Sequence, residues 1–411
     1  MQTATSIQVS RLTIADTNTS IPGNDDLKFL SFGIPSIGSE KVVFYGCNGD
    51  KCGIYFQSIA TDLVSENPQA LNLVCNLSSA LPTIGNPTSI DPDPVIDDKQ
   101  ICFKASNGIT QGIYSFNTTT SEIGELATFP ASEKISSISA KNGMVAFQKN
   151  NAVNNTDNGI WLIQKNNLTR LVVGDNSNTP VQILGNPMNP NNMLIGTSRP
   201  YLGDNHLIFV GKLQNAPTGH TEDALIVYNL AFKGLLSVMR KGDKLPSGNQ
   251  VVGKHPFISP ISYRDGHIAC NVEYNNSDAS STRYMMIVID SKYEISEITA
   301  IDTINPVPGV SVYSSSFEQP PMTSSGKVCF AADVELTSNE PSTNLFGNVF
   351  GSLSSYIEGY TYPYNGKSYL QKISHNGNGL DSDQVVARCF WNNGQSENED
   401  NLGIYLFGLS Q

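Results

Sequence analysis

The chain has 411 residues, a formal net charge of −12 and a charged fraction of only 15%. The negative charge argues against binding to nucleic acid or to an anionic membrane surface, because phosphate contacts need clustered Lys and Arg. No apolar stretch approaches the length that spans a bilayer, so membrane insertion is not expected either.

One apolar triplet recurs along the whole chain and predicts the fold. Its clearest copy is Val42-Val43-Phe44, which follows a turn at Gly38 and precedes a second apolar strand, Gly53-Ile54-Tyr55. Turn residues such as Asn142-Gly143 and Asp265-Gly266 stand before other copies, as in tight hairpins between two strands. Each unit is too small to bury both faces of its sheet unless it stacks on its neighbours. The seven copies end at Phe44, Phe103, Phe147, Phe209, Cys270, Phe330 and Ala387.

The two chain ends predict that the repeats close into a ring. The seventh unit stops at Gln411, directly after its third strand, and a sequence that matches the missing fourth strand lies within residues 7–23. One N-terminal strand, residues 7–15, would complete the last blade and remove two open sheet edges. We therefore predict an all-β, seven-bladed β-propeller that forms a single domain over residues 1–411.

The third copy of the repeat resembles bacterial tandem-repeat proteins. It reads Asn142-Gly143-Met144-Val145-Ala146-Phe147 and later Gly159-Ile160-Trp161. This is similar to an NxxGxxxxAF-type repeat followed by a Gly-Ile-Tyr or Gly-Ile-Trp strand. The resemblance implies a β-propeller-like repeat scaffold, and it implies neither an activity nor site residues.

The cysteines favour structural roles. Cys102, Cys270 and Cys329 fall within strand triplets, where buried free thiols are expected. Cys47 and Cys52 bracket a short hairpin loop, and either a disulfide across the hairpin or two reduced thiols would fit that position. A zinc site is not expected, because the pair has no second pair nearby.

The densest acidic group of the chain is a candidate metal site. It consists of Asp91, Asp93, Asp97 and Asp98, and several carboxylates in a short segment are the ligands that Ca²⁺ prefers. However, the prolines between them stiffen the segment, and the spacing is not that of an EF-hand loop. A solvated turn is therefore the preferred interpretation, no cofactor is expected, and Ca²⁺ is the alternative.

The loop between the second and third strands of each unit varies most in length. Loops of varying length on a rigid scaffold are where binding usually resides. The longest such loop is expected between Phe330 and Tyr356, and it contains an apolar stretch that a plain linker would not need. We predict that this stretch is partly exposed and binds a ligand, with plugging of the central channel as the alternative. Its apolar residues are Leu345, Phe346, Val349 and Phe350.

A second candidate is the polar group His220, Glu222 and Asp223. These side chains could form an acid–base or metal group. They are expected to lie in one long polar loop, so exposure to solvent is the preferred interpretation.

No catalytic set recurs in the repeats. The sequence therefore favours a monomeric, non-enzymatic binding propeller that presents its variable loops to a protein or glycan ligand. The alternative is a propeller hydrolase or lactonase-type enzyme with a carboxylate or metal site at the central channel. The first residues lack both the basic and the apolar part of a signal peptide, which fits a cytoplasmic protein or one secreted by a leaderless route. A cleaved leader whose place Met1 has taken fits as well, so the sequence leaves the localisation open.

Overall fold

The hairpin around each apolar triplet is the central element of each sheet. In the computed structural model the two strands pair antiparallel, with Phe44 opposite Tyr55 and Phe103 opposite Tyr114. All four side chains are buried, because apolar residues on both faces of a sheet are covered by the neighbouring sheets. The structure describes residues 8–59, 70–151, 158–173, 179–183, 192–215, 218–252, 257, 261–275, 283–300, 311–312, 321–335, 341–349, 354–357, 363–364, 368–374, 379–381, 383–392 and 401–410.

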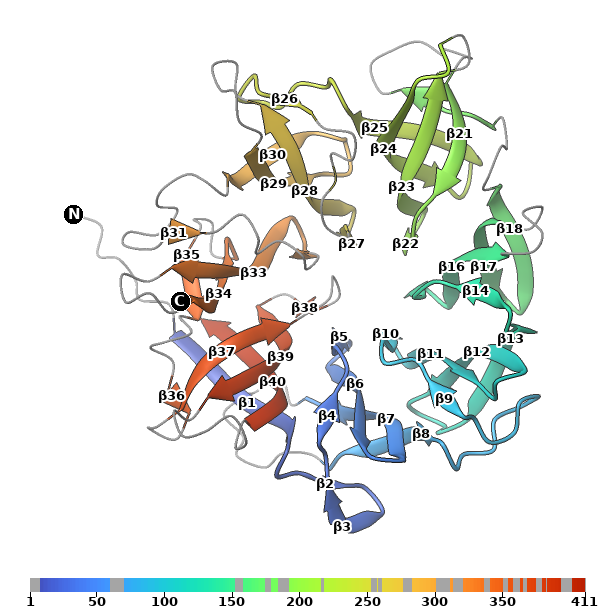
Figure 1. Ribbon diagram of the computed structural model, residues 1–411, viewed down its shortest axis with the longest axis vertical. Helices are drawn as coiled ribbons and strands as arrows, with labels where there is room; N and C mark the ends of the chain where they lie inside the picture. Colours follow the sequence, from blue (N-terminus) through green and yellow to red (C-terminus); the bar gives the residue numbers. More distant parts are fainter. Residues whose placement is uncertain are drawn as a thin grey trace.

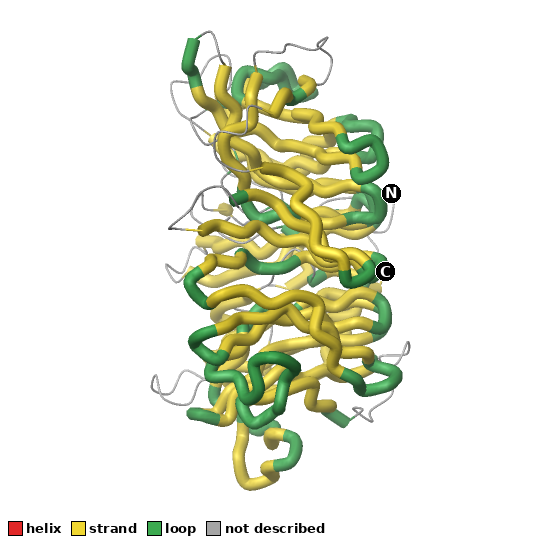
Figure 2. The backbone as a smooth tube through the Cα atoms, turned by 90° about the vertical axis from the view of Figure 1, so that its right-hand side faces the viewer, coloured by secondary structure: helices red, strands yellow, loops and turns green. Residues whose placement is uncertain are grey.

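Within these ranges every regular element is a β-strand. The described residues include no helix, and so none that is long and apolar enough to cross a membrane. Their strands form seven sheets of five to seven strands each and one two-stranded sheet. Figure 1 shows the larger sheets arranged around a common centre, and Figure 2 shows the same ring from the side as a flattened disc. The prediction of an all-β propeller is confirmed.

The innermost strand of most sheets is broken into two short pieces that both pair with the triplet strand. In the second sheet the break is Asp91-Pro92-Asp93-Pro94, and proline cannot donate a hydrogen bond to the ladder. The first three sheets contain β4 (Ser31–Phe32), β5 (Ser36–Gly38), β6 (Lys41–Asn48), β7 (Lys51–Ser58) and β8 (Asn72–Asn76); β9 (Ser89–Ile90), β10 (Val95–Asp97), β11 (Gln100–Ser106), β12 (Thr110–Asn117) and β13 (Ile123–Pro130); and β14 (Glu133–Ile135), β15 (Ser139–Lys141), β16 (Met144–Asn151), β17 (Gly159–Gln164) and β18 (Asn167–Val173).

The next three sheets repeat this plan. The fourth has two additional strands: β19, which pairs antiparallel with β21, and β20, which pairs parallel with β25. Their strands are β19 (Thr179–Pro180), β20 (Gln182–Ile183), β21 (Asn192–Thr197), β22 (Tyr201–Leu202), β23 (His206–Asn215), β24 (Thr221–Asn229) and β25 (Gly234–Arg240); β26 (Gln250–Val251), β27 (Ser262–Arg264), β28 (His267–Asn275), β29 (Arg283–Ile289) and β30 (Ile295–Ala300); and β31 (Ser311–Val312), β32 (Met322–Ser324), β33 (Lys327–Glu335), β34 (Pro341–Gly347) and β35 (Ser354–Ile357).

The last large sheet combines both ends of the chain. The N-terminal strand β1 pairs antiparallel with the C-terminal strand β40, from Gln8 opposite Ser410 to Asp16 opposite Gly403. In Figure 1 this is the blue strand beside the red ones. The sheet contains β36 (Pro363–Tyr364), β37 (Ser368–Ser374), β38 (Leu380–Asp381), β39 (Gln384–Asn392), β40 (Asn401–Ser410) and β1 (Gln8–Asp16), and the two-stranded sheet contains β2 (Ser20–Ile21) and β3 (Asn24–Lys28).

The inner strands follow one another around the centre of the molecule. β5 contacts β10, β10 contacts β15, and the succession continues through β22, β27 and β32 to β38, which contacts β5. Charged side chains on these strands and on the turns that follow them are therefore brought together from sheets far apart in the sequence.

The prediction of a long loop after Phe330 is wrong. Strand β33 continues to Glu335, and β34 then forms the third strand of that sheet, with Phe346 opposite Phe330. Leu345 is fully buried and Val349 is 1% exposed, so neither is an exposed binding residue or a plug of the channel. They pack in a core shared with the last sheet. Phe350 and the side chain of Phe346 lie outside the described residues.

Candidate active site at the mouth of the central channel

The turns that follow five successive inner strands surround one cavity. The cavity has a volume of about 90 Å³, and it lies at one end of the central channel. The strands are β5, β10, β15, β22 and β27, and each contributes the residues at its end and in its turn. We call this cavity the channel mouth. Its charged and phenolic side chains are Asp97, Asp98, Lys141, Asp204, Tyr263, Arg264 and Asp265.

Lys141 lies between two carboxylates that come from the sheets on either side of its own. Its Nζ is 3.9 Å from Oδ1 of Asp97 and 4.0 Å from Oδ1 of Asp204. Asn142, the next residue of the turn, donates a 3.0 Å hydrogen bond to the same Asp204 oxygen. The Asp97 side chain is 14% exposed and that of Asp204 is 62% exposed. Asp97 is therefore the more enclosed carboxylate of the pair, and Asp204 faces solvent.

Tyr263 contributes a hydroxyl group that stays protonated. Burial, followed by the charges of Asp204, Tyr293 and Asp265, raises the pKa of the Tyr263 phenol to about 12. At neutral pH this side chain is therefore a hydrogen-bond donor rather than an anion. A glycine is needed at position 203 beside it, because a Cβ there would overlap the ring of Tyr263.

Arg264 also lines the cavity and reaches a strand of another sheet. Its guanidinium lies 2.9 Å from Oδ1 of Asp381 and donates a hydrogen bond to the carbonyl of Leu380. Those partners belong to β38, and β32 lies between β27 and β38 in the ring of inner strands. The ion pair therefore joins two sheets that are separated by one other sheet in the ring.

A second ion pair joins two sheets at the opposite end of the inner strands. Arg199, which precedes β22, lies 3.2 Å from Oδ2 of Asp93, which precedes β10. Strand β15 lies between these two strands in the ring. Asp93 and Asp97 are four residues apart in an extended segment, so the two levels are roughly 13 Å apart.

The four predicted metal ligands do not converge. Asp91 pairs with Lys104 at 2.8 Å and Asp93 pairs with Arg199, while Asp97 and Asp98 lie at the channel mouth. Among the residues that the structure describes, no group of three or more His, Cys, Asp or Glu side chains is placed to hold a metal ion. The alternative of a Ca²⁺ site stays a prediction.

The second predicted group is spread over a strand rather than a loop. Strand β24 begins at Thr221, so the expected long polar loop around His220 is wrong. Glu222 and Asp223 are successive strand residues and point to opposite faces of the sheet. Glu222 pairs with Arg240 at 3.2 Å, and His220 is exposed at the turn.

Sequence reasoning missed Lys141, Asp204, Tyr263 and Arg264 as site residues. The turn residues before the triplets were assigned only a role in chain reversal. Their position carried the available signal: Asp97, Lys141 and Arg264 each end an inner strand at the same place relative to the triplet. Aligning the units on the triplet would have placed these charges at one level of the ring.

The comparisons with known proteins bear on the fold. No family model and no curated protein matches this sequence. Among solved structures, a prolyl endopeptidase is similar with a TM-score of 0.51 at 9% identity, over 92% of this chain and 50% of that chain. The β-propeller domain of a trilobed protease from Pyrococcus furiosus gives 0.49 at 12% identity, over 91% of this chain and 95% of that chain. An oligogalacturonate lyase from Vibrio parahaemolyticus gives 0.49 at 9% identity, over 98% of both chains.

The prediction of a non-enzymatic binding protein is corrected by these findings. The prolyl endopeptidase, which shares the fold, is an enzyme, so the fold is compatible with the alternative prediction of a propeller enzyme. The chain spans half the length of the prolyl endopeptidase. At 9% identity the likeness shows the fold alone, so any chemistry has to be argued from the channel mouth.

Proposed function

We propose that this chain is a propeller hydrolase whose reaction site is the channel mouth. The observation that supports this most is the arrangement of Asp97, Lys141 and Asp204, which three different sheets bring into one cavity. Paired carboxylates beside a cation are typical of sites that activate water and stabilise a developing negative charge.

We also infer that each of the seven larger sheets is one blade and that β1 closes the ring. Two observations support this. The inner strands contact one another in an unbroken cycle, and β1 supplies the outer strand of the sheet that β40 would otherwise leave with an open edge. On this view residues 1–411 form one propeller, and the channel mouth is a rigid site shared by several blades.

Asp97 is the proposed general base. It is the more enclosed carboxylate, and it can take a proton from a water molecule that attacks the substrate in the cavity. The Lys141 ammonium group and the Tyr263 hydroxyl can donate to the oxygen on which negative charge develops. Asp204 holds Lys141 from the other side and faces solvent.

The spacing of the carboxylates limits the reaction types. Because each carboxylate oxygen lies about 4 Å from the same nitrogen, they are at most about 8 Å apart, a separation that also suits the acid–base pairs of glycoside hydrolases. Esters and glycosides are therefore the substrates to test. Hydrolysis of an ester requires attack on a carbonyl carbon and hydrolysis of a glycoside requires attack on a sugar carbon, so the class that reacts identifies the type of reaction.

The experiment is a panel of chromogenic aryl esters and aryl glycosides with the purified chain and three variants. We expect one class to be hydrolysed, with kcat/KM reduced about 100-fold or more in Asp97→Asn and clearly reduced in Asp204→Asn. Asp25→Asn is the matched control, because Asp25 is exposed on β3, outside the larger sheets. The proposal fails if no substrate of either class reacts, or if all three variants hydrolyse it at the wild-type rate.

A further inference from the structure

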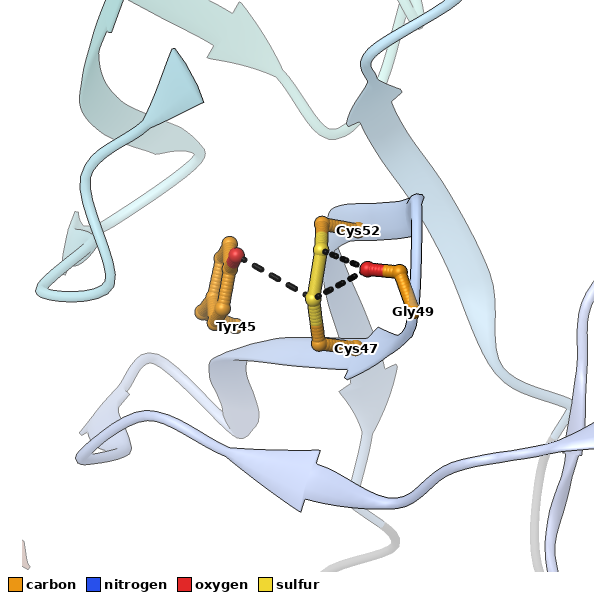
Figure 3. The surroundings of a disulfide bond; sticks show 4 residues. All are labelled: Tyr45, Cys47, Gly49 and Cys52. Carbon is orange, nitrogen blue, oxygen red and sulfur yellow. Dashed lines mark hydrogen bonds between the residues drawn. A yellow bond between two sulfur atoms is a disulfide. The ribbon is translucent and has the colours of Figure 1, made fainter.

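The turn between β6 and β7 is flanked by a disulfide. It lies at the end of β6 that is remote from the channel-mouth turn between β5 and β6. Cys47 and Cys52 stand directly opposite each other in the two strands, their Cα atoms are 4.1 Å apart, and their sulfur atoms are bonded. Figure 3 shows the pair beside Gly49, which lies with Asp50 at the exposed tip of the hairpin. Of the two states that the sequence left open, the structure has the oxidised one.

The two sulfur atoms have different surroundings. The Tyr45 hydroxyl oxygen lies 3.3 Å from Sγ of Cys47, whereas the carbonyl oxygen of Gly49 lies 3.3 Å from Sγ of Cys52 and 3.8 Å from Sγ of Cys47. Burial raises the pKa of the Tyr45 phenol, so its O–H stays available as a donor. A donor stabilises a thiolate and a carbonyl accepts from a thiol, so a reduced pair would hold the thiolate at Cys47 and the S–H at Cys52.

Access to the pair has the same asymmetry. Cys47 is half-buried, whereas Cys52 is only 9% exposed. A reactant from solvent therefore meets the Cys47 sulfur first. This is the order of a redox pair in which the accessible cysteine forms the mixed disulfide and the buried one resolves it.

The five other cysteines are poor competitors for the same chemistry. All are buried free thiols: Cys75, Cys102, Cys270, Cys329 and Cys389. Burial raises the pKa of Cys75, Cys102 and Cys270 to about 12, and it also raises the pKa of the remaining two. Because the thiolate is the reactive form, these residues stay inert while the protein is folded.

We propose that Cys47 and Cys52 form a redox-active site whose substrate is a dithiol. A thiolate of the dithiol attacks Sγ of Cys47, the bond between the two protein sulfurs breaks, and Cys52 leaves with the electron pair and takes up a proton. The second thiolate of the dithiol then attacks the other dithiol sulfur, which is bonded to Cys47, and releases Cys47 as a thiolate. The dithiol ends as a cyclic disulfide, and the protein gains two electrons. Tyr45 stabilises the released thiolate, and Gly49 accepts from the new Cys52 thiol.

The first test uses the unmodified chain. The folded protein is treated with dithiothreitol, alkylated with iodoacetamide, and mapped by peptide mass. We expect Cys47 to react at least about tenfold faster than any of the five buried thiols, and we expect the untreated protein to take up no label at Cys47. The proposal is overturned if dithiothreitol releases no label in the folded protein, or if the buried thiols react as fast as Cys47.

The second test separates a redox site from a purely structural crosslink. Cys52→Ser leaves Cys47 as a free thiol, and Cys47→Ser leaves Cys52. We expect alkylation near neutral pH to be about tenfold faster in Cys52→Ser, and we expect Tyr45→Phe added to that variant to move the midpoint of alkylation to higher pH. A structural disulfide alone also allows the faster alkylation of Cys52→Ser, because Cys47 is the more exposed cysteine, but it predicts a midpoint that Tyr45→Phe does not move. A midpoint that Tyr45→Phe leaves in place, or equal rates in the two single variants, refutes the proposal.

Discussion

Strand β1 should contribute to the core of the whole ring, and Ile14 is the residue that tests this. Its side chain is 4% exposed and lies in a core cluster with Phe29, which follows β3, with Val42 of the first sheet and with Ile404 of its own sheet. Truncation of a buried Ile to Ala removes apolar contacts and leaves a cavity, at a cost of about 2–5 kcal/mol. Across 411 residues the entropy of unfolding is about 0.9 kcal/mol/K, so Tm should fall by about 2–6 °C.

Differential scanning calorimetry of Ile14→Ala measures this shift. The matched control is Ile109→Ala, the same chemical change at a side chain that is 81% exposed in the turn between β11 and β12. Its effect on the free energy of unfolding should stay within about 0.5 kcal/mol. If the two variants melt at the same temperature as the wild type, β1 is not part of the core, and the closure of the ring by the N-terminal strand is refuted.

Three further results are expected. Phe103→Ala should cost about 3–5 kcal/mol in chemical denaturation, because the fully buried ring stacks on Tyr114 at 5.6 Å, and a loss below about 1 kcal/mol would contradict that packing. A double-mutant cycle of Arg264→Met and Asp381→Asn should give a coupling energy of about 1–2 kcal/mol, and additive effects would show that the pair does not join the two sheets. The pKa of Tyr263 is raised to about 12, against 10.0 in the unfolded chain, so its contribution to stability is complete below pH 10.0 and is lost as pH rises toward 12. Between these pH values the free energy of unfolding should therefore fall less steeply in Tyr263→Phe than in the wild type, and equal slopes in the two proteins would refute this prediction.

The sequence predicts the strands well where turn chemistry and strand pattern agree. The pairing of Phe44 with Tyr55 follows from a triplet, a short loop and a Gly-Ile-Tyr strand, and the structure has that register. The sixth unit fails because its third strand lacks the Gly-Ile-Tyr pattern. Leu345 lies there in a strand whose first half is Pro-Ser-Thr-Asn. The sequence of this segment therefore resembles an exposed loop, although Leu345 is buried in the core.

The candidate site cannot be predicted from any single repeat of the sequence. Asp97, Lys141 and Asp204 belong to three different units, and only the ring of inner strands brings them within one cavity. Each residue is ordinary in its own turn, where Asp and Lys are common on the surface. What distinguishes them is the register shared between units, together with the curvature that turns successive inner strands toward one centre.

The kcat/KM of Asp97→Asn on the substrate identified from the panel, measured beside that of Asp25→Asn, is the most direct test of the channel mouth as a reaction site. The account predicts that Asp97→Asn lowers kcat/KM about 100-fold or more and that Asp25→Asn leaves it unchanged. An Asp97→Asn variant that keeps the wild-type kcat/KM would contradict the account and place the chemistry elsewhere.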